Sequence, residues 1–162
     1  MWNTIVGKIQ SNQDPVIDLA LGGALGSFRA PNLIAKSLDF ALTGKLSASA
    51  FESLGRGIHF ETKQNSWRWL TRNFEHLKGR YGASATRVAL SIGRHFCRLP
   101  DATKIQAFLI QNSALSPNIK TRIAKTVMAI EHCSKTAQVV SSSLGPRLRQ
   151  MTPVPGRKLR NQ

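Results

Sequence analysis

Two histidine and cysteine pairs are the side chains of this 162-residue chain best suited to chemistry. His95 is two residues before Cys97, and His132 directly precedes Cys133. Four such ligands can bind zinc, and a cysteine beside a histidine can act as a nucleophile. The spacing matches no short zinc motif, however, and adjacent residues on a helix point about 100° apart. We therefore expect no catalytic residue and no metal site in this chain, and we interpret both cysteines as buried, reduced thiols.

Basic residues are the second feature that could serve a function. Lys and Arg outnumber Asp and Glu by 23 to 8, which gives a net charge of +15. Residues 1–75 hold 8 basic and 6 acidic residues, whereas residues 76–162 hold 15 and 2. Such a surface can bind nucleic acid, attract an acidic partner or peptide, or remain a solvated face without a ligand. The residues that we expect to form a basic binding surface are Arg87, Arg94, Arg98, Lys120, Arg122 and Lys125.

The spacing of these residues favours some ligands over others. Arg87, Arg94 and Arg98 stand at i, i+7 and i+11, so we expect them along one ridge of a helix. A nucleic acid would be bound there through its phosphates, with a steep dependence on salt. Aromatic residues do not alternate with the basic ones, which argues against stacking of single-stranded bases.

Composition limits the class of protein. Hydrophobic residues make up 41% of the chain, enough for one domain with a core. No apolar run approaches the roughly 18 residues of a membrane span, and the first ten residues lack the apolar region of a secretory signal. The sequence therefore predicts a cytoplasmic protein without a membrane span.

The elements that would position these side chains are helices. No segment alternates with a period of two, and apolar residues at helical spacing predict about seven helices joined by short loops. The residues that we expect to cap or open helices are Asp14, Ser47, Thr62, Ser84, Asp101 and Ser116 with Pro117. We expect the Gly22-Gly23 pair to allow a close approach between helix backbones.

A tryptophan-rich helix over residues 62–79 carries the strongest pattern. Its apolar stripe consists of Trp67, Leu70, Phe74 and Leu77. Trp69 lies off this stripe, which predicts a helix that is contacted on two sides. Gly79 is the residue expected just after its end.

The rhythm of the helices predicts the architecture. Helix pairs begin near Pro31, Lys63 and Asp101, and such spacing is typical of helical repeats. We therefore expect an all-α fold, a right-handed array of the HEAT or armadillo kind, over residues 1–140. Residues 141–162 carry three prolines and five basic residues without an acid, so we expect a basic, disordered tail there.

Residues 14–134 resemble the C-terminal helical domain of the zinc aminopeptidases, in particular the puromycin-sensitive, endoplasmic-reticulum and alanyl aminopeptidases. Three segments carry the resemblance through the order and spacing of their packing residues. The tryptophan helix matches that family at Trp67, Trp69, Leu70, Asn73, Phe74, Glu75 and Leu77. An earlier helix pair matches at Ala24, Leu25, Gly26, Phe28, Pro31, Leu33 and Ile34. A later segment matches at Phe96, Asp101, Ala107, Phe108 and Leu109.

The resemblance implies a non-catalytic domain that walls the substrate cavity of a zinc metallo-aminopeptidase and contributes to peptide selection. The HExxH zinc motif and the segment that holds the substrate amino terminus are missing, so we expect no activity from this chain alone and no cofactor in it. Zinc would belong to a separate catalytic domain, which is the implied partner, together with peptide. The chain could be a fragment, a separate subunit or a relic of an enzyme. The alternative is a small basic helical protein that binds nucleic acid or an acidic protein.

Overall fold

The computed structural model describes residues 1–11, 14–113 and 116–150 of the chain. These residues form eight α-helices and no strand, so the predicted all-α class is confirmed. The helices are α1 Trp2–Ser11, α2 Pro15–Gly26, α3 Pro31–Leu42, α4 Ala48–Gly57, α5 Lys63–Tyr81, α6 Ala83–Gly93, α7 Leu99–Asn112 and α8 Pro117–Gln150. Seven of them are the expected helices, and α1 is an additional one.

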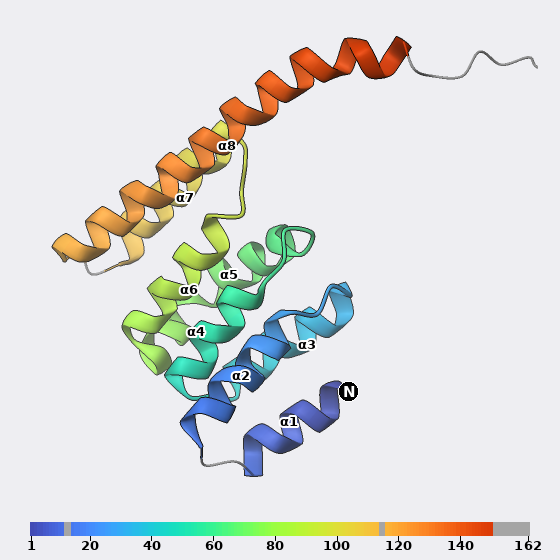
Figure 1. Ribbon diagram of the computed structural model, residues 1–162. Helices are drawn as coiled ribbons and strands as arrows, with labels where there is room; N and C mark the ends of the chain where they lie inside the picture. Colours follow the sequence, from blue (N-terminus) through green and yellow to red (C-terminus); the bar gives the residue numbers. More distant parts are fainter. Residues whose placement is uncertain (12–13, 114–115, 151–162) are drawn as a thin grey trace, which may run out of the picture.

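The helices lie in two layers with a hairpin at one end (Figure 1). In one layer α2 packs on α4 and α4 on α6, and in the other α3 packs on α5. The layers join where α2 meets α3 and α5 meets α6, while α1 covers α2. Helices α7 and α8 pair closely with each other but contact α6 over only a small area. The hairpin is also attached through Phe108 of α7, whose ring contacts those of Trp67 and Phe74 of α5.

Side-chain caps explain where several helices begin. The Asp14 carboxylate accepts a hydrogen bond from the Val16 amide at 2.8 Å, and Pro15 follows it as the first helical residue of α2. The Ser47 hydroxyl caps α4 by accepting from the Ala50 amide at 3.1 Å. Both agree with the expected caps.

A close contact between α2 and α4 forms the tightest helix pair. Gly22 and Gly26 of α2 lie directly on the backbone of α4, where a Cβ at either position would overlap the carbonyl oxygens of Ala50 and Leu54. A Cβ on Gly57 would lie 2.6 Å from the Gly23 carbonyl oxygen. The expected close approach at the glycine pair is confirmed, and it holds the two axes together without intervening side chains.

The tryptophan helix, α5, is longer than its pattern predicts. It passes Gly79 and ends at Tyr81, and Gly82 terminates it with a φ of 55°, which favours glycine. Thr62 does precede its first residue, but the Thr62 hydroxyl donates to the His59 carbonyl at 3.2 Å instead of capping α5. The helix therefore begins where expected, but its end was predicted wrongly.

The second half differs from the sequence prediction at three helix ends. Helix α6 spans Ala83–Gly93, so Ser84 lies inside it instead of capping it. Helix α7 begins at Leu99, so Asp101 lies in its first turn and does not cap it. Helix α8 continues through Ser141 to Gln150, so the predicted loss of helix at Ser141 is wrong. Residues 151–162 of the predicted tail lie outside the described residues, and the division into 1–140 and 141–162 stays a prediction.

The core runs through the two layers and into the hairpin. Leu25 of α2, Phe51 of α4 and Leu70 of α5 are fully buried, as are Leu109 of α7 and Ile130 of α8. Within the described residues, none of the helices has the length and apolar character needed to cross a membrane.

Candidate functional site

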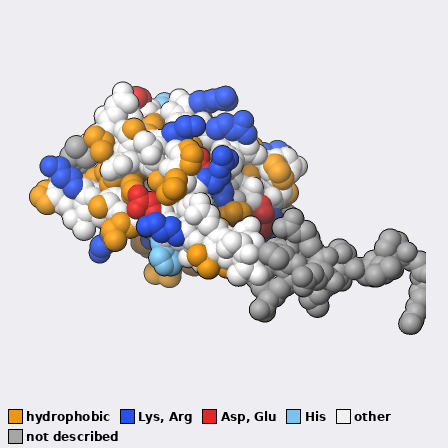
Figure 2. Space-filling view, turned by 90° about the horizontal axis from the view of Figure 1, so that it is seen from above, with side chains coloured by type: hydrophobic (Ala, Val, Ile, Leu, Met, Phe, Trp, Pro, Cys, Tyr) orange, Lys and Arg blue, Asp and Glu red, His pale blue; other side chains and the backbone are white. Residues whose placement is uncertain are grey.

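Four of the six predicted basic residues surround one pocket. Arg87 and Arg94 come from α6 and the residue just after it, and Arg122 and Lys125 come from α8. The other lining residues are Leu90, Ser91 and Thr126. Figure 2 views the molecule from above and shows several Lys and Arg side chains close together on that face. We call this hollow the α6–α8 basic pocket.

The remaining two basic residues lie elsewhere. Arg98 stands at the start of α7, after α6 has ended, so it does not continue the ridge of Arg87 and Arg94. Lys120 lines a different hollow, which Ile110 and Ile123 of the hairpin also border. The predicted ridge of three arginines therefore holds only for its first two members.

Glu52 of α4 pairs with one of the basic residues that line the pocket. Its carboxylate accepts hydrogen bonds from the Ser84 hydroxyl at 2.6 Å and from the Arg87 guanidinium at 2.5 Å. Burial alone would raise the pKa of Glu52, but these two hydrogen bonds and the charges of Arg87 and Arg56 together lower it. Glu52 is therefore ionised and compensates the charge of Arg87, which sequence reasoning missed because the two residues are 35 positions apart.

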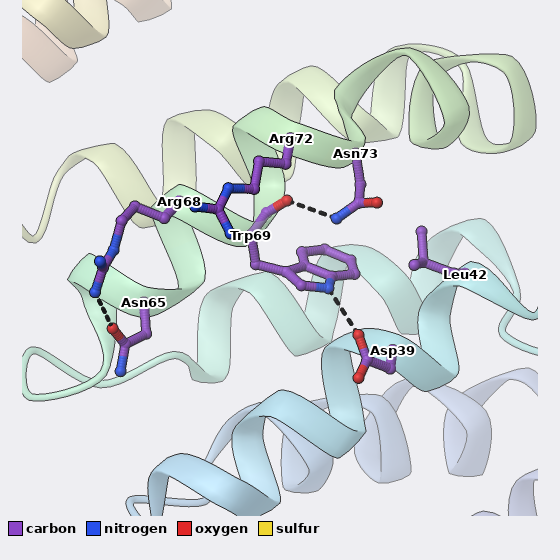
Figure 3. Close-up of a pocket in the computed structure, with 7 residues that line it drawn as sticks. All are labelled: Asp39, Leu42, Asn65, Arg68, Trp69, Arg72 and Asn73. Atoms are coloured by element: carbon purple, nitrogen blue, oxygen red, sulfur yellow. Dashed lines mark hydrogen bonds between the residues drawn. The ribbon is translucent and has the colours of Figure 1, made fainter.

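A second polar hollow of about 330 Å³ lies where α3 faces α5 (Figure 3). The Trp69 indole N–H donates to the Asp39 carboxylate of α3 at 2.9 Å. Arg68 and Arg72 of α5 border the same hollow, and the Arg68 guanidinium donates to the Asn65 side chain at 2.6 Å. An indole, a carboxylate and two guanidinium groups offer both charges and an apolar face to a peptide-like ligand.

Of the packing residues that we expected to anchor the fold, namely Trp67, Trp69, Leu70, Phe74, Phe96 and Phe108, all the aromatic ones except Trp69 form a cluster on the other side of α5. Trp67 contacts the rings of Phe96 and Phe108 edge to face, at centroid distances of 6.0 and 5.3 Å. Phe74 contacts Phe108 in the same way at 5.0 Å, and Leu70 is fully buried beside them. Trp67 and Trp69 therefore contact different neighbours, which confirms that α5 is contacted on two sides.

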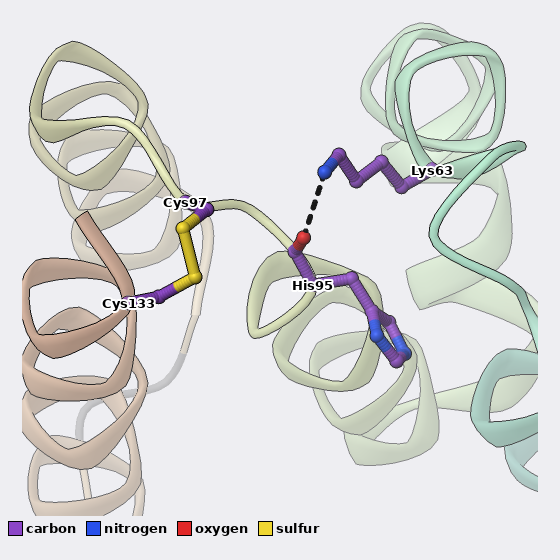
Figure 4. Close-up of a disulfide and its surroundings, with 4 residues drawn as sticks. All are labelled: Lys63, His95, Cys97 and Cys133. Atoms are coloured by element: carbon purple, nitrogen blue, oxygen red, sulfur yellow. Dashed lines mark hydrogen bonds between the residues drawn. A yellow bond between two sulfur atoms is a disulfide. The ribbon is translucent and has the colours of Figure 1, made fainter. Parts of the chain in front are cut away.

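The two cysteines form a disulfide and not a pair of buried thiols, so that interpretation is wrong. Cys97 lies in the connection between α6 and α7, and Cys133 lies on α8, with 5.1 Å between their Cα atoms (Figure 4). Cys133 is exposed and Cys97 half-buried. The bond fixes α8 to the connection that leads into α7. Neither sulfur is left as a nucleophile or as a zinc ligand.

A buried lysine holds the same connection from the other side. The Lys63 ammonium donates to the His95 carbonyl oxygen at 2.9 Å (Figure 4). It also lies over the Phe60 ring. Burial lowers the pKa of Lys63. Burial also lowers the pKa of His95, and the charges of Arg94, Lys63 and His59 add to the effect. Sequence reasoning assigned no role to this pair.

The chemistry of the described side chains lies in their charges and hydrogen-bond donors. Among them no three His, Cys, Asp or Glu residues come together in a way that could hold a metal ion. The two hollows present fixed charges and hydrogen-bond donors, which can bind a ligand or a partner surface. The positions of the charged side chains therefore decide which ligands the two hollows can bind.

Comparison with known proteins identifies the family to which this helical arrangement is similar. The family model described as the ERAP1-like C-terminal domain matches residues 1–132, which include α1 to α7 and the first half of α8. No curated protein and no solved structure matches the chain.

Proposed function

The chain belongs to the family of ERAP1-like C-terminal domains, and from this we propose that it is the non-catalytic helical part of a zinc metallo-aminopeptidase. Its role is to wall the substrate cavity and to contribute to peptide selection. The partner is the catalytic domain, which supplies the zinc. The observation that carries this proposal is the family match over residues 1–132.

The two-layered arrangement supports the role of a wall. Helices α2, α4 and α6 lie side by side, and α3 and α5 back them (Figure 1). Stacked helix pairs of this kind build extended, curved surfaces, and we propose that they belong to a right-handed array of the HEAT or armadillo kind. The hollow at Asp39 and Trp69 is the place on this surface that we propose for peptide contact.

Two activity measurements test the proposal. The chain alone, supplied with zinc and an aminoacyl-anilide, is expected to give no hydrolysis. The catalytic part of an aminopeptidase of this family, deprived of its own C-terminal domain, is then mixed with the chain and given peptides of graded length. We expect the chain to change the relative rates with which long and short peptides are cut. Hydrolysis by the chain alone, or unchanged length preference together with no complex in solution, would contradict the proposal.

The disulfide indicates the kind of cellular compartment in which the protein folds. We infer that the protein folds where thiols are oxidised, because disulfides persist in such environments and are rare in the cytosol. The Cys97–Cys133 bond thus favours a different location from the cytoplasm that the sequence predicted. Mass spectrometry of the protein from its native cells, with free thiols alkylated before lysis, distinguishes the two.

Nucleic acid is a second candidate partner, and the convergence of four basic side chains is what favours it. None of the residues lining that pocket is aromatic, so binding would depend on phosphates alone. Binding to DNA and RNA at two salt concentrations tests this candidate, and no binding at the lower concentration would remove it.

A further inference from the structure

The α6–α8 basic pocket lies where α8 of the hairpin meets α6 of the layered helices. Its volume is about 200 Å³. Two of its basic residues come from α6 and its end, which belong to the layered part, and two come from α8 of the hairpin. A ligand held by all four would therefore attach the hairpin to the layers.

Among the described residues, only one of the four basic side chains of this pocket is paired with an acid. Glu52 compensates Arg87, at 2.5 Å. Arg94, Arg122 and Lys125 form no ion pair with any residue in the described ranges. Helix α6 contains no acidic residue, and the one acid in the sequence of α8 is Glu131, nine residues beyond Arg122. Three positive charges therefore meet around a small volume.

The donors are also suitably arranged. Arg87 and Arg94 are seven residues apart and lie on one face of α6, with Ser91 between them. Arg122 and Lys125 are three residues apart and project from one face of α8. Guanidinium groups offer paired N–H donors that match the oxygens of a phosphate. A single carboxylate would neutralise only one of the three uncompensated charges, whereas a phosphate or pyrophosphate carries two or more.

We propose that the α6–α8 basic pocket binds a phosphate-bearing anion, which the Arg94, Arg122 and Lys125 side chains hold between α6 and α8. The bound anion stabilises the attachment of the α7–α8 hairpin to the layered helices. This site does not depend on the proposed role in an aminopeptidase.

Thermal unfolding with sodium pyrophosphate as the probe tests this proposal, with sodium chloride at equal ionic strength as the reference. A ligand that binds the folded protein raises the midpoint of unfolding with a saturable dependence on concentration. We expect this rise for the unaltered chain. For the double variant Arg94→Gln, Arg122→Gln we expect the affinity for pyrophosphate to fall by a factor of about ten or more. The variant Arg94→Lys, Arg122→Lys keeps the charge but loses the paired donors, so its affinity should fall between the two.

A charge-matched control separates a site from general attraction. The double variant Lys104→Gln, Lys135→Gln removes the same charge from exposed positions outside the pocket. It should bind pyrophosphate like the unaltered chain. Equal loss in both Gln double variants, or a midpoint that responds to pyrophosphate no more than to chloride, would overturn the proposal.

Two further ligands test the class of occupant. A hexaglutamate peptide or a short DNA duplex is titrated in place of pyrophosphate. If either binds more tightly than pyrophosphate and loses that affinity in the Arg94→Gln, Arg122→Gln variant, the pocket receives an acidic segment or a nucleic acid, and the small-anion proposal is wrong. Neither readout involves peptide hydrolysis, so its outcome is independent of the aminopeptidase assays.

Discussion

At the scale of single residues, His95 is surrounded by groups that oppose its protonation. Its Nε2 atom is buried and has no hydrogen-bond partner among the described residues. Burial is the largest cause of its lowered pKa, and Arg94, Lys63 and His59 contribute positive charge. Its carbonyl oxygen meanwhile accepts the hydrogen bond of the Lys63 ammonium. The residue therefore fixes the connection between α6 and α7 while its own ring remains neutral.

This environment predicts how stability depends on pH. The pKa of His95 in the folded protein lies below its usual 6.5, so the unfolded chain binds more protons just below that pH. The free energy of unfolding should therefore rise with pH in this interval and fall on acidification. Urea unfolding between about pH 5 and pH 7 should show a steeper dependence for the unaltered chain than for His95→Gln. Parallel profiles for the two proteins would show that His95 does not contribute.

Lys63 shows which structural features could be predicted from the sequence and which could not. Its side chain lies on the buried face of α5, in the series Lys63, Ser66, Leu70, Phe74, Leu77 and Tyr81. The helical spacing of that series already places Lys63 among buried residues. Its acceptor, the His95 carbonyl, is 32 positions away and became adjacent only when α5 packed beside the end of α6. The burial was thus predictable from the spacing, but the hydrogen bond was not.

At the scale of elements, the contact of α2 with α4 depends on missing side chains. Replacement of Gly22 by alanine would place a Cβ within 2.8 Å of the Ala50 Cα, in addition to its overlap with the carbonyl. These atoms are backbone, so they cannot rotate away. The helices would have to separate, and the packing of Leu25 and Phe51 beside them would loosen.

We therefore expect Gly22→Ala to lower the free energy of unfolding by about 2–3 kcal/mol, as for overpacked cores. The matched control is Gly79→Ala, because Gly79 lies within α5 and nothing stands within 4 Å of a Cβ there. That substitution should raise the free energy of unfolding by about 0.5 kcal/mol, since alanine favours helix over glycine. Chemical denaturation measures both. A Gly22→Ala protein as stable as the control would mean that α2 and α4 can move apart without cost.

The predicted helix ends are correct where a nearby side chain caps the helix. They are wrong where a contact with a distant residue determines the end of the helix. Asp14 and Ser47 cap the helices that follow them, and both bonds are made within three residues. Ser84 has a cap-like sequence, but its hydroxyl donates to Glu52 of another helix. Helix α5 continues past Gly79 because the Tyr81 hydroxyl reaches the Ala41 carbonyl at 2.5 Å, a contact that spans 40 positions.

At the scale of the whole molecule, the α7–α8 hairpin is joined to the layered helices by its contacts with α6 and by the packing of Phe108 on Trp67 and Phe74 (Figure 1). The Lys63 hydrogen bond holds the layered side of the connection, and the Cys97–Cys133 disulfide holds the hairpin side (Figure 4). Reduction of the disulfide should therefore affect the hairpin more than the layers.

The disulfide closes a loop with a sequence separation of 36 residues, for which a stabilisation of about 2–4 kcal/mol is typical. We expect dithiothreitol to lower the unfolding midpoint and to increase amide hydrogen exchange first in α7 and α8. The double variant Cys97→Ser, Cys133→Ser should be as stable as the reduced protein and insensitive to dithiothreitol. Two free thiols in the unreduced, denatured protein would contradict the assigned bond.

The family and the all-α class could be recognised from the sequence because packing residues such as Trp67 and Phe108 stand in a fixed order. The disulfide could not, because two cysteines 36 positions apart carry no local signal of pairing. The basic pocket could be predicted only in part, because its residues come from two helices. Arg87 and Arg94 share a helix face, but only the packing of α6 on α8 brought Arg122 and Lys125 beside them.

The disulfide also determines how the chain would transmit a mechanical load. A pull on the carboxyl end of α8 passes through Cys133 directly to Cys97 and into the layered helices, so α7 and the first part of α8 carry no tension. The enclosed segment would add about 120 Å to the extension of the stretched chain once the bond is reduced, at about 3.4 Å per residue for its separation of 36. The fully stretched chain with the disulfide intact is therefore shorter by that length than the reduced chain.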